Sequence, residues 1–313
     1  MRISLALLLF IVIGQPVFAQ DTGLEMLNIA PTPFSLSKGE ATTSVPDGAA
    51  SMFSNPALLV MNPTSSLNLG YSIWIADVDN VFGGVNFKSN RRAAAFSFYS
   101  SGSSNYQQRN QPGPSNGDFS IQYLSVSAAY AYDFSLFSLG ATAQYLNEQA
   151  YSYRASGYAF NFGIARNFLD ERIRTGVSFS NLGEMGKLNN EATELPSNFK
   201  MGISADIVQF SPPKNNDLPI LFSVAVDYVN PLQSTDNKDY ANYTSPDPHL
   251  NLGFEFTVAE VLSVSTGYKT QNSVRPISFG ASIHSETITF DYALIPFNTG
   301  FGTVHSIGIK YKF

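Results

Sequence analysis

The sequence predicts an all-β chain, a transmembrane antiparallel β-barrel of about 14 strands with a short N-terminal helical plug segment. Three observations support this prediction. Charged side chains make up 13% of the 313 residues, about half the share usual in a soluble domain. From about residue 66 onward, apolar or aromatic side chains alternate with small or polar ones. Beyond the first twenty positions, no stretch approaches the roughly 18 consecutive apolar residues that a membrane-spanning helix needs.

The N-terminus has the features of an export signal. Met1 and Arg2 form a short basic region, residues 3–13 are apolar except for Ser4, and Ala19 before Gln20 ends a small-residue cleavage site. A retained helical anchor is disfavoured because the apolar run is too short to cross a membrane. We therefore expect a signal peptide at 1–19, an N-terminal hatch or plug segment at 20–63 and a barrel at 64–313, in a protein exported to the bacterial outer membrane.

The period-two alternation places two kinds of side chain on opposite faces. Phe160, Phe162 and Ile164, for example, alternate with Asn161 and Gly163. Similar segments lie near 66–75, 81–88, 92–100, 119–133, 135–147, 153–167, 172–181, 198–210, 219–229, 249–258, 261–270, 275–284, 287–295 and 302–313. A soluble β-sandwich would carry Lys, Glu and Arg on its polar face, whereas this face is mostly Gly, Ser, Ala, Asn and Thr. Lipid against the apolar face and a crowded interior explain that inversion.

Connection lengths give an independent test of the fold. The longest connections, residues 101–118, 182–197 and 230–248, follow the third, seventh and ninth predicted strands, whereas several even-numbered strands end in tight turns. Outer-membrane barrels have short periplasmic turns and longer external loops. With the N-terminus in the periplasm, the pattern fits such a barrel better than a soluble barrel or propeller, although the connection at 211–217 is long for a periplasmic turn.

Residues 20–63 break the alternation and contain two helix-start signals. Asp47 precedes residues 48–53 as a candidate cap, and Asn55 precedes Pro56 at the first position of a second short helix. A barrel of about 14 strands is wide enough to need filling, because eight strands are already filled by their own side chains. We therefore expect this segment to plug the lumen; the alternative is a periplasmic tail.

Both ends of the mature chain resemble one family. Residues 39–43, followed by a hatch motif, are similar to the N-terminal signature of the PorV/PorQ family of FadL-like outer-membrane barrels, although Ser51 and Leu58 replace the usual alanine and glycine. The hatch motif comprises Asp47, Asn55, Pro56, Ala57 and Leu59; the closing-hairpin motif comprises Asp291, Tyr292, Thr303 and His305. Ile309, Tyr311 and terminal Phe313 resemble the C-terminal signal that the barrel-assembly machinery recognises.

The resemblance implies a component of the type IX secretion system. Such a barrel would act as a non-enzymatic scaffold or shuttle, with outer-membrane lipid around it and with other type IX secretion proteins and cargo C-terminal domains as partners. No cofactor is implied. A FadL-like transporter for hydrophobic small molecules is the alternative, and the small, polar face of the strands argues weakly against it.

Other functional classes have little support in the sequence. Its 18 basic residues are scattered, which disfavours nucleic-acid binding, and the absence of cysteine excludes disulfides and thiolate metal sites. No hydrolase, metalloprotease or nucleotide-binding motif occurs, and the three histidines are His249, His284 and His305. Counting along the last hairpin sets His305 opposite Asp291, but the alternation puts them on different faces unless a bulge intervenes. We expect a structural or interfacial histidine rather than an enzyme.

Several charged residues fall on the inward face of the predicted strands. They are Arg174, Lys200, Asp206, Asp227, Glu255, Lys269, Asp291 and Lys310. Their mixed signs favour ion pairs between wall and plug over a polar substrate site or a channel gate.

The predicted orientation can be tested with single cysteines, because the native chain has none. Cysteines at Ser104 and Ser234 should react with a membrane-impermeant thiol reagent on intact cells, whereas a cysteine at Ser285 should not. Reaction at Ser285 would overturn the topology.

Overall fold

The computed structural model describes residues 24–108, 115, 117–189, 191–210, 219–232, 247–298 and 300–313; the predicted signal peptide lies outside them. Within these residues, fourteen strands form one closed barrel, which confirms the predicted fold class. The strands are β1 (Ser66–Ile73), β2 (Asp79–Ser89), β3 (Arg92–Gln108), β4 (Gly117–Asp133), β5 (Ser138–Ala150), β6 (Tyr153–Phe168), β7 (Ile173–Met185), β10 (Asn198–Phe210), β11 (Ile220–Pro231), β12 (His249–Val258), β13 (Leu262–Lys269), β14 (Ile277–His284), β15 (Ile288–Pro296) and β16 (Thr303–Lys312).

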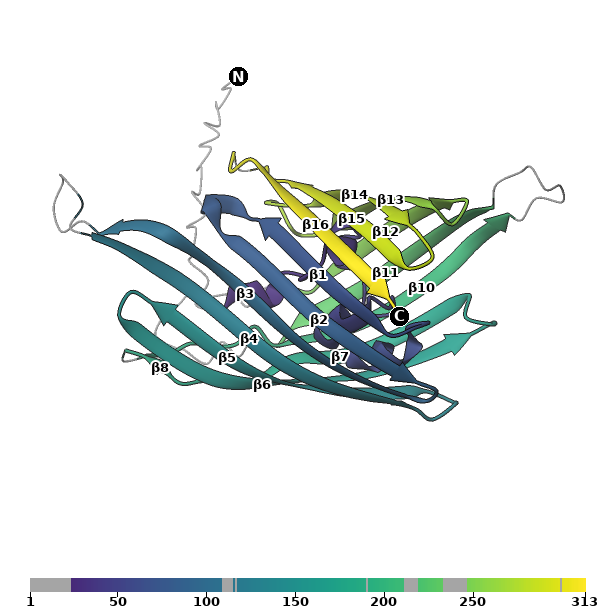
Figure 1. The fold of residues 1–313 in the computed structure, drawn as a ribbon, viewed down its shortest axis with the longest axis horizontal. Helices are drawn as coiled ribbons and strands as arrows, with labels where there is room; N and C mark the ends of the chain where they lie inside the picture. The colour runs from purple at the N-terminus through teal and green to yellow at the C-terminus, as the bar shows by residue number, and fades with distance from the viewer. Residues whose placement is uncertain are drawn as a thin grey trace, which may run out of the picture.

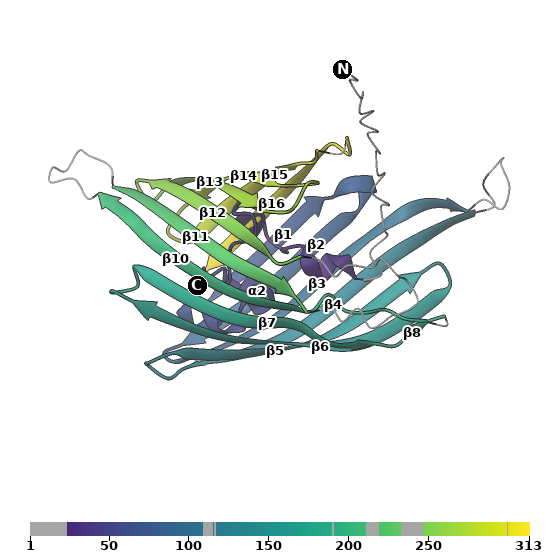
Figure 2. The same ribbon diagram turned by 180° about the vertical axis from the view of Figure 1, so that it is seen from behind.

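The barrel closes where its first and last strands meet. β1 pairs antiparallel with β16 from Ser66 opposite Lys312 to Ile73 opposite His305. Figures 1 and 2 show the strands slanting around the wall, with the yellow last strand beside the dark blue first one. Closure leaves no sheet edge with unpaired backbone groups, which is the condition for a sheet to cross lipid.

The two faces of the wall have the inverted polarity that the alternation predicts. Along β6, Phe160, Phe162 and Ile164 are each about half exposed, whereas Asn161 and Gly163 between them are buried. Because the barrel interior is occupied, the exposed apolar residues are those of the outer surface. No helix of the described residues is long and apolar enough to cross a membrane.

The structure corrects some predicted strand ends. The third strand continues to Gln108 and the fourth begins at Gly117, so most of the predicted connection 101–118 is paired strand. The pairing passes an irregularity between Ser103 and Tyr106, after which Tyr106 stacks on Phe119 with ring centroids 5.3 Å apart. The Ser, Gly and Asn residues there resemble a loop in sequence, and cross-strand pairing overrides that local preference. Ser104 therefore lies in β3.

The connections differ at the two ends of the barrel. One end, the long-loop end, carries residues 109–116, 186–197 and 232–248, much of which lies outside the described residues, as does Ser234. The connection from β7 to β10 contains the two-residue strands β8 (Lys187–Leu188) and β9 (Glu191–Ala192). The other end, the tight-turn end, carries short turns such as residues 90–91 and 285–287. It also carries the connection from β10 to β11, where the predicted long turn at 211–217 lies outside the described residues.

Residues 24–63, called the hatch below, lie inside the barrel. Their helices are η1 (Glu25–Asn28), α1 (Pro33–Ser37), η2 (Gly48–Ala50), α2 (Ser51–Ser54) and η3 (Pro56–Met61). In Figures 1 and 2 these purple coils lie between the front and rear walls. Helix α1 packs against β13 to β16, whereas η3 packs against β2 to β6. The hatch therefore contacts opposite arcs of the wall.

Candidate functional site

The candidate functional site is the interface between the hatch and the barrel wall. Small wall residues allow the two backbones to approach closely. A β-carbon added at Gly163 would overlap the Asn55 side chain, and one added at Gly176 would overlap the Thr43 carbonyl. Glycine is required at such positions because any side chain would displace the part of the hatch that faces it. The small inward residues of the alternation thus make room for the hatch.

Asn55 connects a turn of the hatch to the wall. Its Oδ1 accepts a hydrogen bond from the Ala57 backbone N–H at 3.1 Å, so it caps η3 as the sequence predicts. Its Nδ2 donates to the carbonyl oxygens of Thr43 at 2.8 Å and Ile164 at 3.1 Å. Pro56 at the first helical position lies against Gly140 of β5. Ala57 and Leu59 are fully buried.

Asp47 has a different role from the predicted helix cap. It precedes η2, but its side chain makes no capping hydrogen bond. Instead its Oδ1 lies 2.8 Å from Lys310 Nζ of β16, and its Oδ2 accepts a hydrogen bond from the Thr32 hydroxyl. A carboxylate that is 2% exposed needs such a partner, and the nearest cation belongs to the wall. Asp47 is therefore a wall contact of the hatch.

Three further ion pairs join the hatch to the barrel on the α1 side. Lys38 Nζ lies 2.8 Å from Glu255 of β12. Glu40 contacts Lys269 Nζ at 2.6 Å and Arg275 Nη1 at 3.0 Å, with 8–16% of each of these three side chains exposed. The expectation of ion pairs between wall and plug thus holds for Glu255, Lys269 and Lys310.

Among the described residues, the other inward charges form no ion pair with the hatch. Asp227 accepts a hydrogen bond from the Thr43 backbone N–H at 2.8 Å. Arg174 pairs with Asp206 at 3.3 Å, and both belong to the wall. Asp291 accepts a hydrogen bond from Ser282 on the neighbouring strand. These contacts join wall strands to one another or, for Asp227, join the wall to the hatch.

The turn after α1 aims Glu40 at its partners. Gly39 and Glu40 both have positive φ, and the Glu40 N–H donates to the Ser35 carbonyl at 2.9 Å, a helix end of the left-handed type. Burial raises the pKa of Glu40, but attraction to Lys269 and Arg275 outweighs it and lowers the pKa from 4.5 to about 2. Because the folded-state pKa is depressed, the stability it contributes is full above about pH 4.5 and is lost as the pH falls towards 2.

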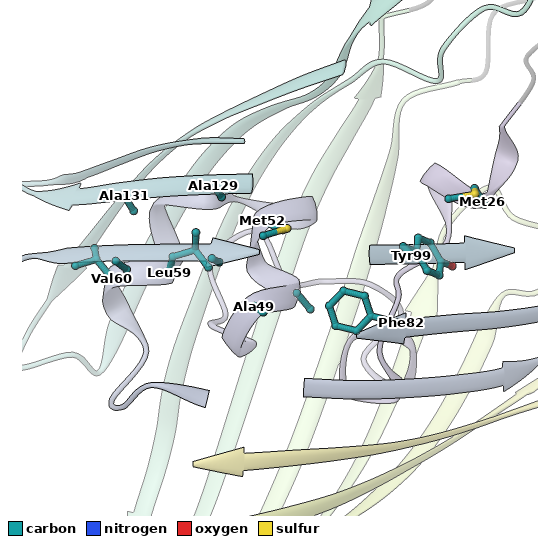
Figure 3. Packing of buried hydrophobic residues seen from close by; sticks show 12 residues of the cluster. Met26, Ala49, Met52, Leu59, Val60, Phe82, Tyr99, Ala129 and Ala131 are labelled. Carbon is teal, nitrogen blue, oxygen red and sulfur yellow. The ribbon is translucent and has the colours of Figure 1, made fainter. Parts of the chain in front are cut away.

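An apolar core lies inside the barrel beside these polar contacts. Met26, Met52 and Leu59 of the hatch belong to one buried apolar cluster with Phe82 and Tyr99 of the wall (Figure 3). A second cluster toward the long-loop end contains Leu24, Leu146, Ala155, Ala159, Met185 and Leu195. Leu27 and Tyr123 pack against both clusters, so the apolar surface is continuous.

Three aromatic rings mark the centre of the first cluster. Phe53 of the hatch meets Phe82 and Tyr99 edge to face, with ring centroids 6.0 and 6.1 Å apart. Phe82 and Tyr99 are themselves 6.4 Å apart in the same geometry. Edge-to-face rings attract one another beyond their burial. This part of the lumen is thus apolar, contrary to the expectation of a small, polar lining.

The closing-hairpin residues do not converge on one site. Asp291 is opposite Gly308, and His305 is opposite Leu294, so the pairing by simple counting is wrong and the alternation is correct. The His305 Nδ1 lies 2.7 Å from the Tyr292 hydroxyl on the outer face. Thr303 is opposite Pro296 at the start of β16. His305 is thus a hydrogen-bonded surface residue.

The C-terminal residues face outward. Ile309, Tyr311 and Phe313 are 42–55% exposed. Phe313 lies 6.1 Å from the rings of both Tyr311 and Phe87, measured between centroids. Whether the assembly machinery reads them stays a prediction.

Several hatch residues at this interface have roles that the sequence patterns do not predict. They are Lys38, Glu40, Thr43, Met52 and Phe53. Glycine after a short helix followed by an acidic residue, Gly39-Glu40, was the available signal for one of them. Among the described residues, no group of His, Asp and Glu could hold a metal ion.

Comparison with solved structures finds the same fold in hydrocarbon channels. The monoaromatic hydrocarbon channel CymD matches with a TM-score of 0.62 and 14% identity, over 90% of this chain and 97% of that one. The toluene transporter TodX of Pseudomonas putida matches with a TM-score of 0.59 and 11% identity, over 90% and 97%. No family model and no curated protein matches the sequence. At these identities the likeness establishes the fold alone, a closed antiparallel β-barrel.

Replacing Glu40 by Gln should loosen the hatch. The change keeps the side-chain size but leaves Lys269 and Arg275 without their carboxylate, at a cost of about 3 kcal/mol. Trp74, the single tryptophan, reports this locally because its ring lies 5.2 Å from the Arg275 guanidinium and packs near Leu36 of the hatch. We expect a lower unfolding midpoint and greater acrylamide quenching of Trp74 in detergent.

Acid titration and a control variant make this prediction specific. In the native chain, quenching of Trp74 should rise as the pH falls from about 4.5 to 2, and Glu40→Gln should lack that step. Asp206→Asn removes a wall-to-wall pair and should leave Trp74 quenching unchanged. Equal quenching in the native and Glu40→Gln proteins would show that the ion pairs do not fasten the hatch.

Proposed function

We propose that this chain is a non-enzymatic outer-membrane channel for small hydrophobic molecules, in which the hatch closes the lumen at rest. The observation that supports it most is the continuous apolar core between hatch and wall. It occurs in a fold shared with a toluene transporter and a monoaromatic hydrocarbon channel, which are not enzymes. The predicted export signal and the lipid-facing wall support a site of action in the outer membrane.

The apolar core offers a path for a hydrophobic ligand. From the long-loop end, Leu24 and Met185 lead through Leu27 and Tyr123 to Met52 beside the aromatic rings. Methionine side chains adapt their shape readily, so they can exchange contacts with one another for contacts with a ligand. Binding sites for small molecules are typically apolar with a few polar groups that orient the ligand. An apolar molecule would therefore bind by replacing hatch contacts with its own.

The hatch must shift for anything to pass. Its helices touch opposite arcs of the wall, and adjacent wall strands are hydrogen-bonded around the whole barrel. The ion pairs of Lys38, Glu40 and Asp47 hold it on one side. On the opposite side the side chains of Met52 and Leu59 pack in the apolar core. The hydrogen bonds of Met52 to the wall are made with the uncharged Ser97, Thr142 and Asn161. A ligand that enters on the apolar side would thus displace hatch contacts there without breaking an ion pair.

A scaffold of the type IX secretion system is the second candidate function. The observation that favours it is the number of buried polar contacts that fasten the hatch, among them those of the resemblance residues Asp47 and Asn55. A lumen that stays closed suits a protein that acts through its external loops. The partners would then be cargo C-terminal domains and other secretion components. This function needs no movement of the hatch.

A disulfide between hatch and wall separates the two candidates. The hydroxyl oxygens of Ser37 in α1 and Ser265 in β13 lie 2.9 Å apart, and the native chain contains no cysteine. A Ser37→Cys/Ser265→Cys protein can therefore be locked by oxidation and released by reduction. If hydrophobic molecules pass beside a moving hatch, the oxidised protein should be inactive and the reduced protein active.

Entry of the aromatic probe N-phenyl-1-naphthylamine into intact cells that express the barrel gives the readout. Each single-cysteine variant serves as a control that oxidation cannot lock. Uptake by the oxidised double variant should fall to that of cells without the barrel. Two results would contradict the channel function: uptake by the double variant that is the same in the oxidised and reduced states, and uptake that never exceeds that of cells without the barrel. In the native host, surface secretion that survives locking favours the scaffold.

A further inference from the structure

The outer surface of the barrel contains a hollow that the hatch and the lumen do not explain. It has a volume of about 550 Å³ and lies over β4 to β7. Its lining includes Tyr130, Tyr132, Phe134, Ala141, Phe162 and Phe179. We call it the outer-wall hollow. Its volume is in the range of sites that hold small ligands.

The hollow arises from one small residue among large ones. In the strand register, Ala141 of β5 lies between Tyr130 of β4 and Phe162 of β6. These two rings are 52% and 48% exposed, so they project from the wall on either side of the alanine. Because the small Ala141 lies between two large aromatic side chains, the outer-wall hollow is open to the surroundings of the barrel. In a membrane those surroundings are acyl chains.

The hollow lies near the tight-turn end of the barrel. Phe134 belongs to the turn between β4 and β5 and is half exposed, and its ring lies 4.7 Å from that of Tyr132. Aromatic residues of this kind gather at the boundary between hydrocarbon and headgroups. With the predicted orientation, this boundary is the periplasmic one, where the outer membrane contains phospholipid. The outer-wall hollow thus begins at the level of the lipid headgroups and extends into the hydrocarbon core of the membrane.

Two arginines flank the outer-wall hollow at the level of the lipid headgroups. The Arg92 guanidinium lies 6.0 Å from the ring centroid of Tyr132. Arg166 follows Ile164 of the lining by one outward position, and its guanidinium lies 4.6 Å from the Phe168 ring. Both side chains are exposed, and neither forms an ion pair within the described part of the chain.

The spacing of the arginines fits a lipid headgroup between them. Arg92 is opposite Tyr132, Tyr132 opposite Leu139, and Leu139 opposite Ile164, so three strand spacings, about 14 Å, separate the two sides. Long, flexible arginine side chains can reach inward from both sides toward one phosphate. Basic side chains at a membrane surface attract anionic lipids.

We propose that the outer-wall hollow binds one anionic phospholipid, with an acyl chain over Ala141 and the phosphate between Arg92 and Arg166. The aromatic side chains that line the hollow would bind the acyl chain by van der Waals contact, and the guanidinium groups would bind the headgroup by electrostatic attraction. A zwitterionic lipid has the same acyl chains but no net negative charge, so it binds more weakly. The site is independent of the lumen, and its occupancy does not depend on whether the hatch moves.

Native mass spectrometry of the full chain in mild detergent tests the proposal. The protein is titrated with dioleoylphosphatidylglycerol and, separately, with dioleoylphosphatidylcholine. We expect one phosphatidylglycerol molecule to bind more tightly than phosphatidylcholine. Arg92→Gln and Arg166→Gln should each weaken phosphatidylglycerol binding about fivefold, the contribution of one basic residue at a membrane surface. Each change should weaken phosphatidylcholine binding less than phosphatidylglycerol binding, because the choline cation offsets the charge of the phosphate.

Filling the hollow provides the second arm. Ala141→Phe should abolish the single bound phosphatidylglycerol. Ala281→Phe is the matched control, because Ala281 of β14 is an exposed alanine outside the hollow, opposite Tyr292 and Val264. Both changes add an apolar side chain to an exposed position of the wall, so both proteins should fold, as an unchanged melting transition would verify.

Three results would overturn the proposal. One is equal binding of the two lipids. Another is phosphatidylglycerol binding that Ala141→Phe does not reduce relative to Ala281→Phe. The third is co-purification of a protein that Ala141→Phe displaces while lipid binding stays unchanged, which would assign the hollow to a protein partner.

Discussion

The requirement that each backbone N–H and C=O be paired inside lipid governs this molecule. A sheet meets it only by closing, and the contact between β1 and β16 closes it. Closure fixes which way each side chain points, because successive residues of a strand face opposite sides. Large apolar residues then fall outside, and what remains inside must be small or must contact whatever fills the lumen.

The hatch follows from the width that closure imposes. Wall glycines such as Gly163 and Gly176 let its backbone approach, and the polar groups that it buries need partners. Asp47 and Glu40 find theirs in Lys310 and Lys269 of the wall. Removing one member of such a pair costs much more than the pair itself contributes. The hatch is therefore held in a defined position, with charges on one arc of the wall and an apolar core on the other.

Much of the fold could be predicted from local pattern, whereas the contacts of the site could not. Alternation along β6 identifies its outward face without any knowledge of neighbours, and Asn55 before Pro56 marks a helix start. The partners of Glu40 lie more than two hundred positions away in the sequence, as the separation of 235 to Arg275 illustrates, and only barrel closure brings them together. Asp47 was misjudged as a cap for the same reason, since Lys310 is at the far end of the chain. The full length of β3 and β4 could not be predicted, because it depends on pairing between the two strands and their Ser-rich and Gly-rich ends have no strand pattern of their own.

The most direct test of the lipid-facing wall is a nitroxide scan of β6 in liposomes. Cysteines placed singly from Tyr158 to Ala165 carry one label each, because the native chain has no cysteine. Collision of the labels with molecular oxygen, which concentrates in hydrocarbon, should rise and fall with a period of two residues, with maxima at positions 158, 160, 162 and 164. Accessibility without that period, or maxima at the odd-numbered positions, would contradict a barrel that turns its large apolar side chains toward lipid.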